Sequence, residues 1–461
     1  MRRSELPVSA EAAFAWHMRP GALERLTPPW VSMRVVRRDP GIREGAQVEL
    51  ALSVAGVPVR WLAEHHDFQW GRGFSDLQRR GPFAHWHHHH RFEPLAADRC
   101  VLEDCVEYAL PAERLTAPLA AARIERQVDT MFAYRHAVTV ADLTAHARHK
   151  EQATMRIAVT GSSGLVGSEL VNFLTTGGHE VVRLVRGSGG TSNAGAASHD
   201  RVVWDPTADR FDAAPLDGVD AVVHLAGESI ASGRWTETQK RRIRESRVHG
   251  TRVLSEALAA MANPPRVYVG ASAIGYYGDR GDESLDEDSP PGDLFLSGVC
   301  RDWEAASQPA ADAGIRVALT RLGVVLSPKG GALSKMLTPF RLGAGGRVGD
   351  GRQYWSWVAI DDVIGALHHA LMTDSLAGPV NVVAPHPVTN LEFTKTLGRV
   401  LRRPTVAPMP AFAARLLLGQ MADELLLARA RVEPQRLLES HYHFRHPNLE
   451  DALRHVLGRP G

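Results

Sequence analysis

The stretch Met155–Gly167, which reads MRIAVTGSSGLVG, decides the fold of most of this chain. An apolar run at 156–159 is followed by a glycine-rich loop, a helical pattern over 165–176 and a second apolar run at 180–185. Glycines between a strand and a helix allow a tight turn, and the N–H groups and positive dipole end of the helix can hold a pyrophosphate. The stretch therefore predicts a dinucleotide site formed by Gly161, Ser162, Ser163, Gly164, Leu165, Val166 and Gly167.

Further apolar runs continue this pattern at 221–226, 266–270 and 315–319. Fully apolar strands separated by helices are typical of a parallel sheet that is covered on both faces. The chain is therefore expected to form an α/β domain over 155–385, a doubly wound Rossmann sheet. Helices predicted at 391–401 and 412–430 form a small C-terminal lobe over 386–461, and the Gly/Ser/Ala-rich segment 187–198 is expected to be a flexible loop.

Cofactor choice is determined at the end of the second strand of such a domain. An acidic residue there would accept hydrogen bonds from the ribose of NAD. This chain has Arg183 and Arg186 instead, with no Asp or Glu from 181 to 193. A guanidinium can pair with the 2′-phosphate of NADP, so the sequence favours NADP(H) over NAD(H). Arg186 is the main candidate, with Ser162 and Ser163 as helpers; the alternative is that Arg186 is a solvated loop residue.

The first third of the chain has a different pattern. Stretches at 46–54, 57–64 and 100–108 alternate in part and are separated by turn residues, which favours an antiparallel sheet. A helical pattern follows over 119–144. We expect an α+β domain over 1–148 and a polar linker over 149–154.

This order of elements resembles the START-like (SRPBCC) helix-grip fold. Members of that group often enclose an apolar ligand between sheet and helix, so the resemblance implies a hydrophobic ligand pocket. The alternative is that the large side chains of this region fill an ordinary core: Trp61, Trp70, Trp86 and Phe132.

A histidine cluster at His85 and 87–90 is the conspicuous polar feature of this region. Alternate residues of a strand face opposite sides, so these histidines are expected to divide between two faces. This favours a solvated cluster, and no metal site is predicted. The three cysteines, Cys100, Cys105 and Cys300, have neither a disulfide framework nor zinc-ligand spacing.

Length and charge limit the function classes. A chain of 461 residues is expected to form two or three domains. Lys and Arg number 53 against 52 for Asp and Glu, which gives no electrostatic reason to expect a nucleic acid or an anionic membrane as partner. No apolar run is long enough to span a membrane, and a cytoplasmic location is expected. The sequence leaves an oligomer open.

Later segments resemble the extended short-chain dehydrogenase/reductase superfamily: His224–Gly227, Ser272–Asp279 and Trp355–Val363. Within it, Leu225–Glu228, Arg234–Trp235, Glu245–Arg247, Asp286–Asp288 and Pro339–Gly343 resemble an atypical group of nucleoside-diphosphate-sugar epimerase-like proteins with their own C-terminal domain. The resemblance implies NAD(P)-dependent chemistry, with Leu225, Ala226 and Gly227 at the cofactor. The order of a START-like domain followed by this module also occurs in that group.

The active-site positions depart from the superfamily pattern. Typical members use Tyr-x-x-x-Lys, but the matching helix here has Leu296 and Cys300 at those positions. Neither residue can take over the proton transfer of the tyrosine or the charge of the lysine. The candidate substitutes are Ser272, Tyr276 and Tyr277 as hydroxyl groups, Glu228 as a base, and Arg247 and Arg352 for an anionic substrate.

Three functions remain open at this level, and the sequence does not decide whether the chain is an enzyme. The first is an NADP(H)-dependent oxidoreductase or epimerase that acts on a small-molecule substrate. The second is a non-catalytic NADP(H)-binding sensor or scaffold coupled to an apolar ligand of the N-terminal domain, which Leu296 and Cys300 favour. The third is a carrier of that apolar ligand.

Overall fold

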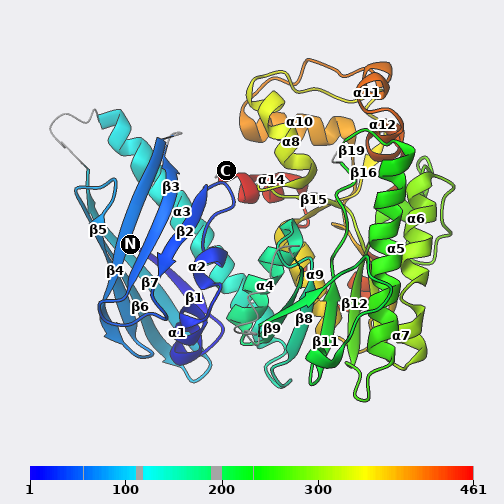
Figure 1. The fold of residues 1–461 in the computed structure, drawn as a ribbon. Coiled ribbons are helices and arrows are strands. Elements are labelled where there is room, and N and C mark those ends of the chain that lie inside the picture. The colour runs from blue at the N-terminus through cyan, green and yellow to red at the C-terminus, as the bar shows by residue number, and fades with distance from the viewer. Residues whose placement is uncertain (55–56, 111–117, 188–199, 232, 460–461) are drawn as a thin grey trace. The chain divides into compact units, whose positions relative to one another are not determined.

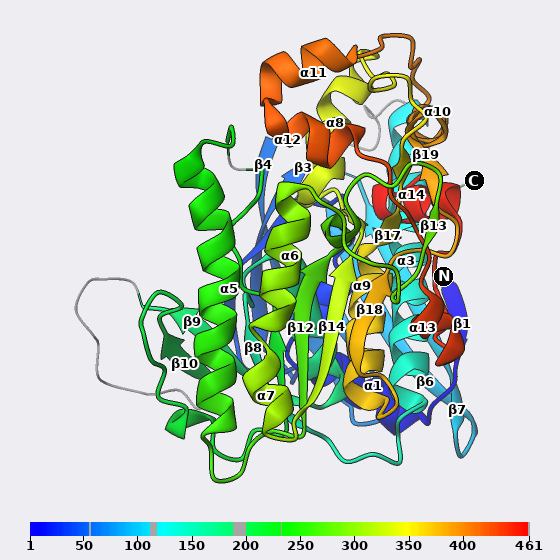
Figure 2. The same cartoon turned by 90° about the vertical axis from the view of Figure 1, so that its right-hand side faces the viewer.

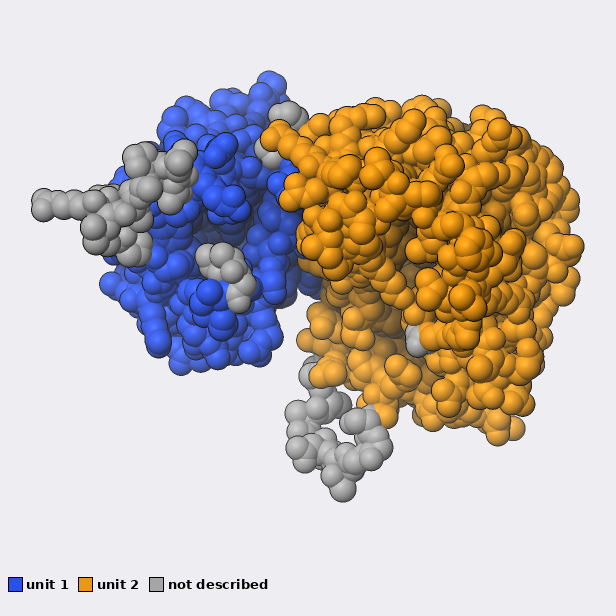
Figure 3. Space-filling view, turned by 90° about the horizontal axis from the view of Figure 1, so that it is seen from above, with its two compact units in different colours: residues 1–153, 172–178, 455–461 blue, residues 154–171, 179–454 orange. Residues whose placement is uncertain are grey.

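The computed structural model describes residues 1–461 except 55–56, 111–117, 188–199, 232 and 460–461. The loop expected at 187–198 therefore lies almost entirely outside the described residues. The chain divides into two compact units (Figure 3). The first unit comprises 1–153, 172–178 and 455–461, and the second unit comprises 154–171 and 179–454.

The first unit is built on a seven-stranded antiparallel sheet with the order β1-β7-β6-β5-β4-β3-β2 (Figure 1). A 30-residue helix, α3, follows the last strand. This sheet and its long C-terminal helix confirm the helix-grip architecture. The elements are β1 (Arg2–Leu6), α1 (Ala10–Met18), α2 (Ala22–Arg25), β2 (Met33–Arg38), β3 (Gln47–Val54), β4 (Val57–Gln69), β5 (Gly73–Arg80), β6 (His85–Ala96), β7 (Arg99–Ala109) and α3 (Pro118–Ala147).

Aromatic rings fill much of the core of this unit. Phe14 of α1 makes edge contacts with Phe74 and Phe92, at centroid distances of 6.0 and 5.6 Å. Trp86 and Phe132 are buried, as the packing alternative predicts. Trp70 does not fit that alternative, because 63% of it is exposed at the end of β4.

The second unit has a seven-stranded parallel sheet with the order β10-β9-β8-β11-β12-β14-β18. The order reverses at β8, where the chain crosses to β11 on the other side; in open α/β sheets, ligands bind at such a switch point. This topology confirms the doubly wound Rossmann fold. The strands are β8 (Arg156–Thr160), β9 (Glu180–Arg186), β10 (Arg201–Trp204), β11 (Ala221–His224), β12 (Val267–Ala273), β14 (Arg316–Leu322) and β18 (Gly378–Val382).

Helices cover this sheet. Three of them, α5 (Glu237–Ala259), α6 (Phe295–Ala305) and α7 (Gln308–Asp312), lie along one face (Figure 2). The helix α9 (Ile360–Met372) packs on β12 and β14, and α4 (Leu165–Gly177) follows β8. The central strands are largely apolar because both faces are covered, and all four residues of β11 are buried.

The second unit has further elements besides this sheet and these helices. They are the helices η1 (Ala214–Leu216), η2 (Ile274–Tyr277), α8 (Gly331–Arg341), α10 (Asn390–Leu401), α11 (Ala411–Leu418), α12 (Gln420–Ala422), η3 (Asp423–Leu427) and α13 (Gln435–Glu439), and the strands β13 (Ser284–Leu285), β15 (Val324–Leu326), β16 (Tyr354–Trp355), β17 (Trp357–Ala359), β19 (Val388–Thr389) and β20 (Arg431–Val432). The last helix of the chain, α14 (Leu449–Leu457), extends across the boundary between the units.

The single helix predicted over 412–430 is wrong. Gly419 has a φ of +63°, which ends α11, and the chain continues as a three-residue helix and a π-turn. Among all the described residues, no helix has both the length and the apolar character that are needed to cross a bilayer.

Candidate functional site

The glycine-rich loop after β8 meets the end of β11. Gly161 has a φ of +65°, and a Cβ atom added there would lie 2.8 Å from the carbonyl carbon and oxygen of Leu225. The hydroxyl of Thr160 accepts hydrogen bonds from the N–H groups of Leu225 and Ala226, at 3.0 and 3.1 Å. Two segments that are 65 residues apart in the sequence are thereby joined, and only glycine fits at position 161.

The same loop leads directly into the N-terminus of α4. The N–H of Gly164 donates to the carbonyl of Gly161 at 2.9 Å, and a Cβ at Gly167 would lie 2.2 Å from that carbonyl oxygen. Gly161 and Gly167 thus pack closely against each other, whereas Ser163 and Gly164 are exposed to solvent. They lead into the first turn of α4, whose free N–H groups can bind an anion.

Arg186 is the last residue of β9, the strand next to β8, and its side chain is exposed. Arg183 is also exposed but lies three residues earlier on the strand. A strand rises by about 3.3 Å per residue, so the Cα atoms of the two arginines lie roughly 10 Å apart along β9. Only Arg186 lies at the carboxyl end of the strand, where a bound dinucleotide would have its ribose.

A buried hydrogen-bond network lies at the end of β12. The hydroxyl of Ser272 donates to Glu304 Oε1 at 2.6 Å. Arg321, which is 3% exposed, donates to both oxygens of Glu304 at 2.8 and 2.9 Å. We call Ser272, Tyr277, Glu304, Arg321 and Asn381 the Arg321 network. Within it, Ser272 is held by a carboxylate that already forms a bidentate ion pair.

The two candidate tyrosines lie in different surroundings. Tyr277 is fully buried; its hydroxyl donates to Asn381 Oδ1 at 2.7 Å and accepts from Arg321 Nη1 at 2.9 Å. Burial raises the pKa of Tyr277 to about 12, although Arg321 and Asn381 act in the opposite direction. Tyr276 is half-buried, and the guanidinium carbon of Arg321 lies 3.5 Å from its ring centroid. Of the pair, Tyr276 is the one with exposed surface.

Leu296 and Cys300 leave no proton donor at the usual positions of α6. Leu296 is 8% exposed and belongs to an apolar cluster with Trp235, Ile243 and Met421. Burial raises the pKa of the Cys300 thiol to about 12, and the nearby Glu304 carboxylate acts in the same direction. Both side chains therefore serve as packing groups at neutral pH.

The side chains of the charged candidates Glu228 and Arg247 each form a hydrogen bond within the chain. Glu228 Oε1 accepts from Gln239 Nε2 at 3.2 Å. Arg247 donates to the carbonyl of Ile243 at 3.0 Å, and its guanidinium carbon lies 5.1 Å from the Trp303 ring. A Cβ added at Gly227 would lie 3.4 Å from that guanidinium carbon, so Arg247 borders the predicted cofactor segment. The catalytic and binding roles of these residues stay predictions.

A pocket of about 390 Å³ in the second unit is lined by loops and by the helices α11 and η3. Arg352 is exposed and does not line it, whereas its neighbours Asp350 and Gln353 do. The arginines of the pocket are ones that sequence reasoning missed: Arg415 pairs with Asp423 at 2.8 Å and Arg429 with Asp350 at 3.0 Å. Position in the sequence does not reveal them, because the lining combines segments that are far apart in the chain: Asp279, Leu294, Gly349, Asp350, Gln353, Ala411, Arg415, Asp423, Leu427 and Arg429.

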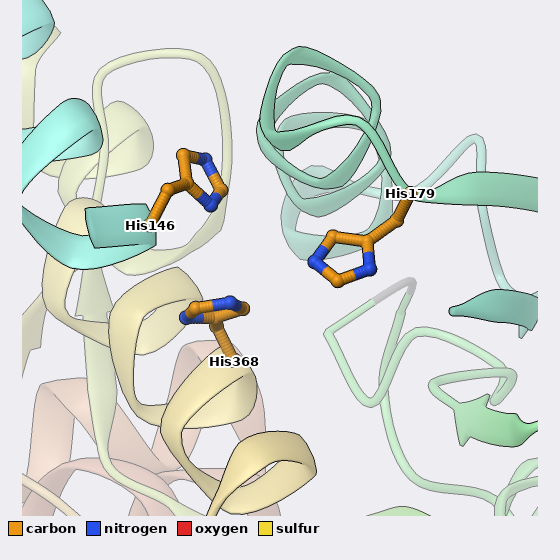
Figure 4. Close-up of side chains that lie close together, drawn as sticks. All are labelled: His146, His179 and His368. Atoms are coloured by element: carbon orange, nitrogen blue, oxygen red, sulfur yellow. The ribbon is translucent and has the colours of Figure 1, made fainter. Parts of the chain in front are cut away.

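Several histidines outside this site take part in packing (Figure 4). His179 and His368 belong to the second unit, where their ring centroids lie 6.0 Å apart and His179 Nδ1 accepts from the N–H of Met155 at 3.1 Å. His146 belongs to the first unit, where its ring stacks on Phe173 at 4.3 Å. These contacts support the ends of β8 and α3.

Comparison with known proteins agrees with this geometry. Residues 157–383 match the NAD dependent epimerase/dehydratase family. An epimerase family protein of Mycobacterium bovis, Mb2239, is 42% identical over 305 residues, which cover 66% of this chain and 98% of the relative. The chain belongs to this epimerase family. The human epimerase family protein SDR39U1 is 37% identical and is covered over its full length, with 66% of this chain.

Solved structures of epimerase family members show the same folds. A nucleoside-diphosphate sugar epimerase from Corynebacterium glutamicum aligns with a TM-score of 0.78 and 36% identity, covering 99% of this chain and 89% of that one. The human SDR39U1 structure, determined with NADPH, aligns with a TM-score of 0.59 and 35% identity over 66% of this chain and 99% of its own. Residues 6–133 match the family of polyketide cyclases, dehydrases and lipid transport proteins, and 409–456 match a domain of unknown function.

Proposed function

We propose that the chain is an NADP(H)-dependent oxidoreductase or epimerase that acts on a small-molecule substrate. The observation that carries this proposal is the closure of the Gly161 loop on Leu225 and Ala226 at the N-terminus of α4. This arrangement offers the backbone donors of a pyrophosphate site at a topological switch point. The human epimerase family structure solved with NADPH supports the same assignment.

The proposal assigns the preference for NADP(H) to Arg186. Its exposed guanidinium at the end of β9 would pair with the 2′-phosphate, with Ser162 and Ser163 on the facing loop. The bound nicotinamide would supply or accept a hydride. The chain's own residues would hold the cofactor through the loop from Gly161 to Gly167 and through Leu225–Gly227.

The first experiment is a calorimetric titration of the full chain with NADPH and with NADH. Arg186→Ala is expected to weaken NADPH binding roughly 10- to 100-fold, as the loss of one charge-assisted phosphate pair implies, and to leave NADH binding unchanged. Arg183→Ala is the matched control, since it removes an equally exposed arginine of the same strand. Equal binding of the two cofactors by the wild-type chain would overturn the preference, and no binding of either would overturn the function.

We further propose that Tyr276 transfers the proton, because it is the only one of the two tyrosines with exposed surface. Arg247, beside Gly227, and the exposed Arg352 would bind an anionic substrate. Once a substrate is found, Tyr276→Phe should lower kcat by about 10²- to 10⁴-fold and leave the NADPH affinity unchanged. An unchanged kcat would remove Tyr276 from the mechanism and leave Ser272, Tyr277 and Glu228 as the remaining candidates.

A second candidate function is a non-catalytic NADP(H) sensor. Buried Leu296 and Cys300 favour it, because neither can exchange a proton where most short-chain dehydrogenases use tyrosine and lysine. Hydride exchange distinguishes the two candidates. Under the sensor hypothesis, NADPH binds tightly but its hydride is transferred to none of a panel of aldehydes, ketones and sugar nucleotides.

The first unit is proposed to bind an apolar ligand between its sheet and α3. The match to polyketide cyclases and lipid transport proteins supports this. Mass spectrometry of organic extracts from the purified chain would test it.

We also propose a cytoplasmic location. It agrees with the three cysteines, which are all free thiols.

A further inference from the structure

The inner face of the first unit's sheet carries a polar cluster that the proposed function does not use. We call Asp76, His88, His90 and Asp104 the inner-face cluster. Asp76 pairs directly with His88 across β5 and β6, and His90 pairs directly with Asp104 across β6 and β7. Directly opposite residues share a face, as do residues two apart on one strand. All four side chains therefore point to the same side, and His88, His90 and Asp104 are only 2%, 7% and 4% exposed.

One oxygen of Asp76, Oδ1, lies 2.5 Å from His65 Nδ1, and the other, Oδ2, lies at metal-ligand separations from both histidines of the cluster. Asp76 Oδ2 lies 3.7 Å from His88 Nδ1 and 3.6 Å from His90 Nε2. These separations exceed the N–H···O range of about 2.7–3.2 Å. Two ligands of a tetrahedral ion with bonds of about 2.1 Å lie about 3.4 Å apart. One ligand atom from each of the three residues lies within 4.8 Å of the others.

The second nitrogen of each histidine faces Asp104. His90 Nδ1 is 2.8 Å and His88 Nε2 is 3.4 Å from Asp104 Oδ1. Within the part of the chain that the structure describes, none of these three buried atoms takes part in a well-aligned hydrogen bond. A carboxylate behind a metal-bound imidazole commonly fixes the orientation of the ring. Asp104 Oδ2 is itself 3.0 Å from His136 Nε2, which anchors this carboxylate to α3.

We propose that Asp76, His88 and His90 bind a divalent first-row transition metal ion such as Zn²⁺, with Asp104 orienting both imidazoles. Two imidazole nitrogens and one carboxylate oxygen form a donor set that suits such ions and leaves a coordination position for water or an added ligand. This proposal reverses the sequence-based expectation that the histidine run forms no metal site.

The strand itself provides a matched control. His87 and His89 lie on the opposite face of β6, where they approach the exposed Asp67. A full-length chain without an added affinity tag, treated with EDTA and dialysed, would be titrated with ZnCl₂ in a calorimeter. We expect one equivalent to bind, at least about 100-fold weaker binding in His88→Ala/His90→Ala, and unchanged binding in His87→Ala/His89→Ala. Visible absorption bands of bound Co²⁺ should follow the same pattern.

A conservative variant separates metal binding from folding. Asp104→Asn keeps the size of the side chain and should weaken Zn²⁺ binding about 10- to 100-fold, as the loss of an orienting carboxylate does elsewhere, with an unchanged far-UV circular dichroism spectrum. Absence of stoichiometric binding by the wild-type chain would overturn the proposal. So would binding that survives His88→Ala/His90→Ala or that is lost in His87→Ala/His89→Ala.

Discussion

Both units bury polar side chains, but the two sets differ in how their donors and acceptors are paired. In the Arg321 network of the second unit, Ser272, Tyr277 and Arg321 each donate directed hydrogen bonds of 2.6–2.9 Å. In the inner-face cluster of the first unit, the nitrogen and oxygen atoms of the four described residues lie 2.8–3.7 Å apart without well-aligned hydrogen bonds to one another, although Asp104 is also bonded to His136. Directed bonds indicate a network that stabilises the fold, whereas converging atoms indicate a place for an ion.

The largest effect should come from breaking the Arg321 network. Arg321→Met leaves Glu304 buried without its ion pair, which typically lowers the free energy of unfolding by about 3–5 kcal/mol. Chemical denaturation of the second unit would measure this loss. Arg183→Met, at an exposed position, serves as control and should change stability by less than about 0.5 kcal/mol. A small loss in Arg321→Met would mean that the network contributes little.

The inner-face cluster should respond to metal rather than to hydrogen-bond deletion. Free Zn²⁺ at about 100 times its Kd should raise the free energy of unfolding of the first unit by about 2.7 kcal/mol, because the ion binds only the folded state. Differential scanning calorimetry with and without EDTA measures the change. The His88→Ala/His90→Ala chain should show none. An equal rise in both chains would place the ion elsewhere and remove the contrast between the units.

Substitution of Tyr276 and of Tyr277 should distinguish a catalytic role from a structural role within the second unit. Tyr277→Phe removes the hydroxyl that bonds Asn381 Oδ1 and Arg321 Nη1 in a buried site, so we expect a loss of about 1–3 kcal/mol in the free energy of unfolding. Tyr276→Phe should change stability by less than about 0.5 kcal/mol. Urea denaturation monitored by circular dichroism would compare the two variants. The reverse order of stability would show that Tyr276 is the structural residue.

The smallest expected effect is a pH dependence at alkaline pH. Burial raises the pKa of Tyr277 from 10.0 to about 12, so the folded chain retains this proton more tightly than the unfolded chain. The contribution is complete below pH 10 and is lost as the pH rises toward 12, by about 1 kcal/mol at pH 11. The stability difference between the wild-type chain and Tyr277→Phe should therefore shrink between pH 9 and pH 11. A constant difference would contradict the raised pKa.

Sequence reasoning predicted both sheets, α3 and the glycine-rich turn, because each depends on local periodicity or on local backbone conformation. It failed at residues 412–430, since the helical pattern there conceals a break at Gly419. It placed Trp70 among core candidates, although 63% of the side chain is exposed. Hydrophobic character alone does not say which residues at the end of a strand are covered.

The candidate site residues likewise divide into those that a local sequence pattern reveals and those that it does not. Gly161 and Gly167 could be recognised because a positive φ and a close backbone approach require glycine. The surroundings of Ser272 and Tyr277 could not, since their partners Glu304, Arg321 and Asn381 come from other segments of the chain. The histidine run was correctly expected to divide between two faces, but the burial of His88 and His90 contradicts the expectation of a solvated cluster.

The sequence by itself determined the main strands of the parallel sheet, several strands of the antiparallel sheet and the helix α3, and also which position requires glycine and which histidines share a face. Those properties depend on backbone geometry within a few residues. Only the tertiary structure decided that Asp76 and Asp104 meet His88 and His90, that Arg321 holds Tyr277, and that Leu296 packs on Trp235. These contacts depend on strand register and helix packing, which bring distant segments together and which no local pattern specifies.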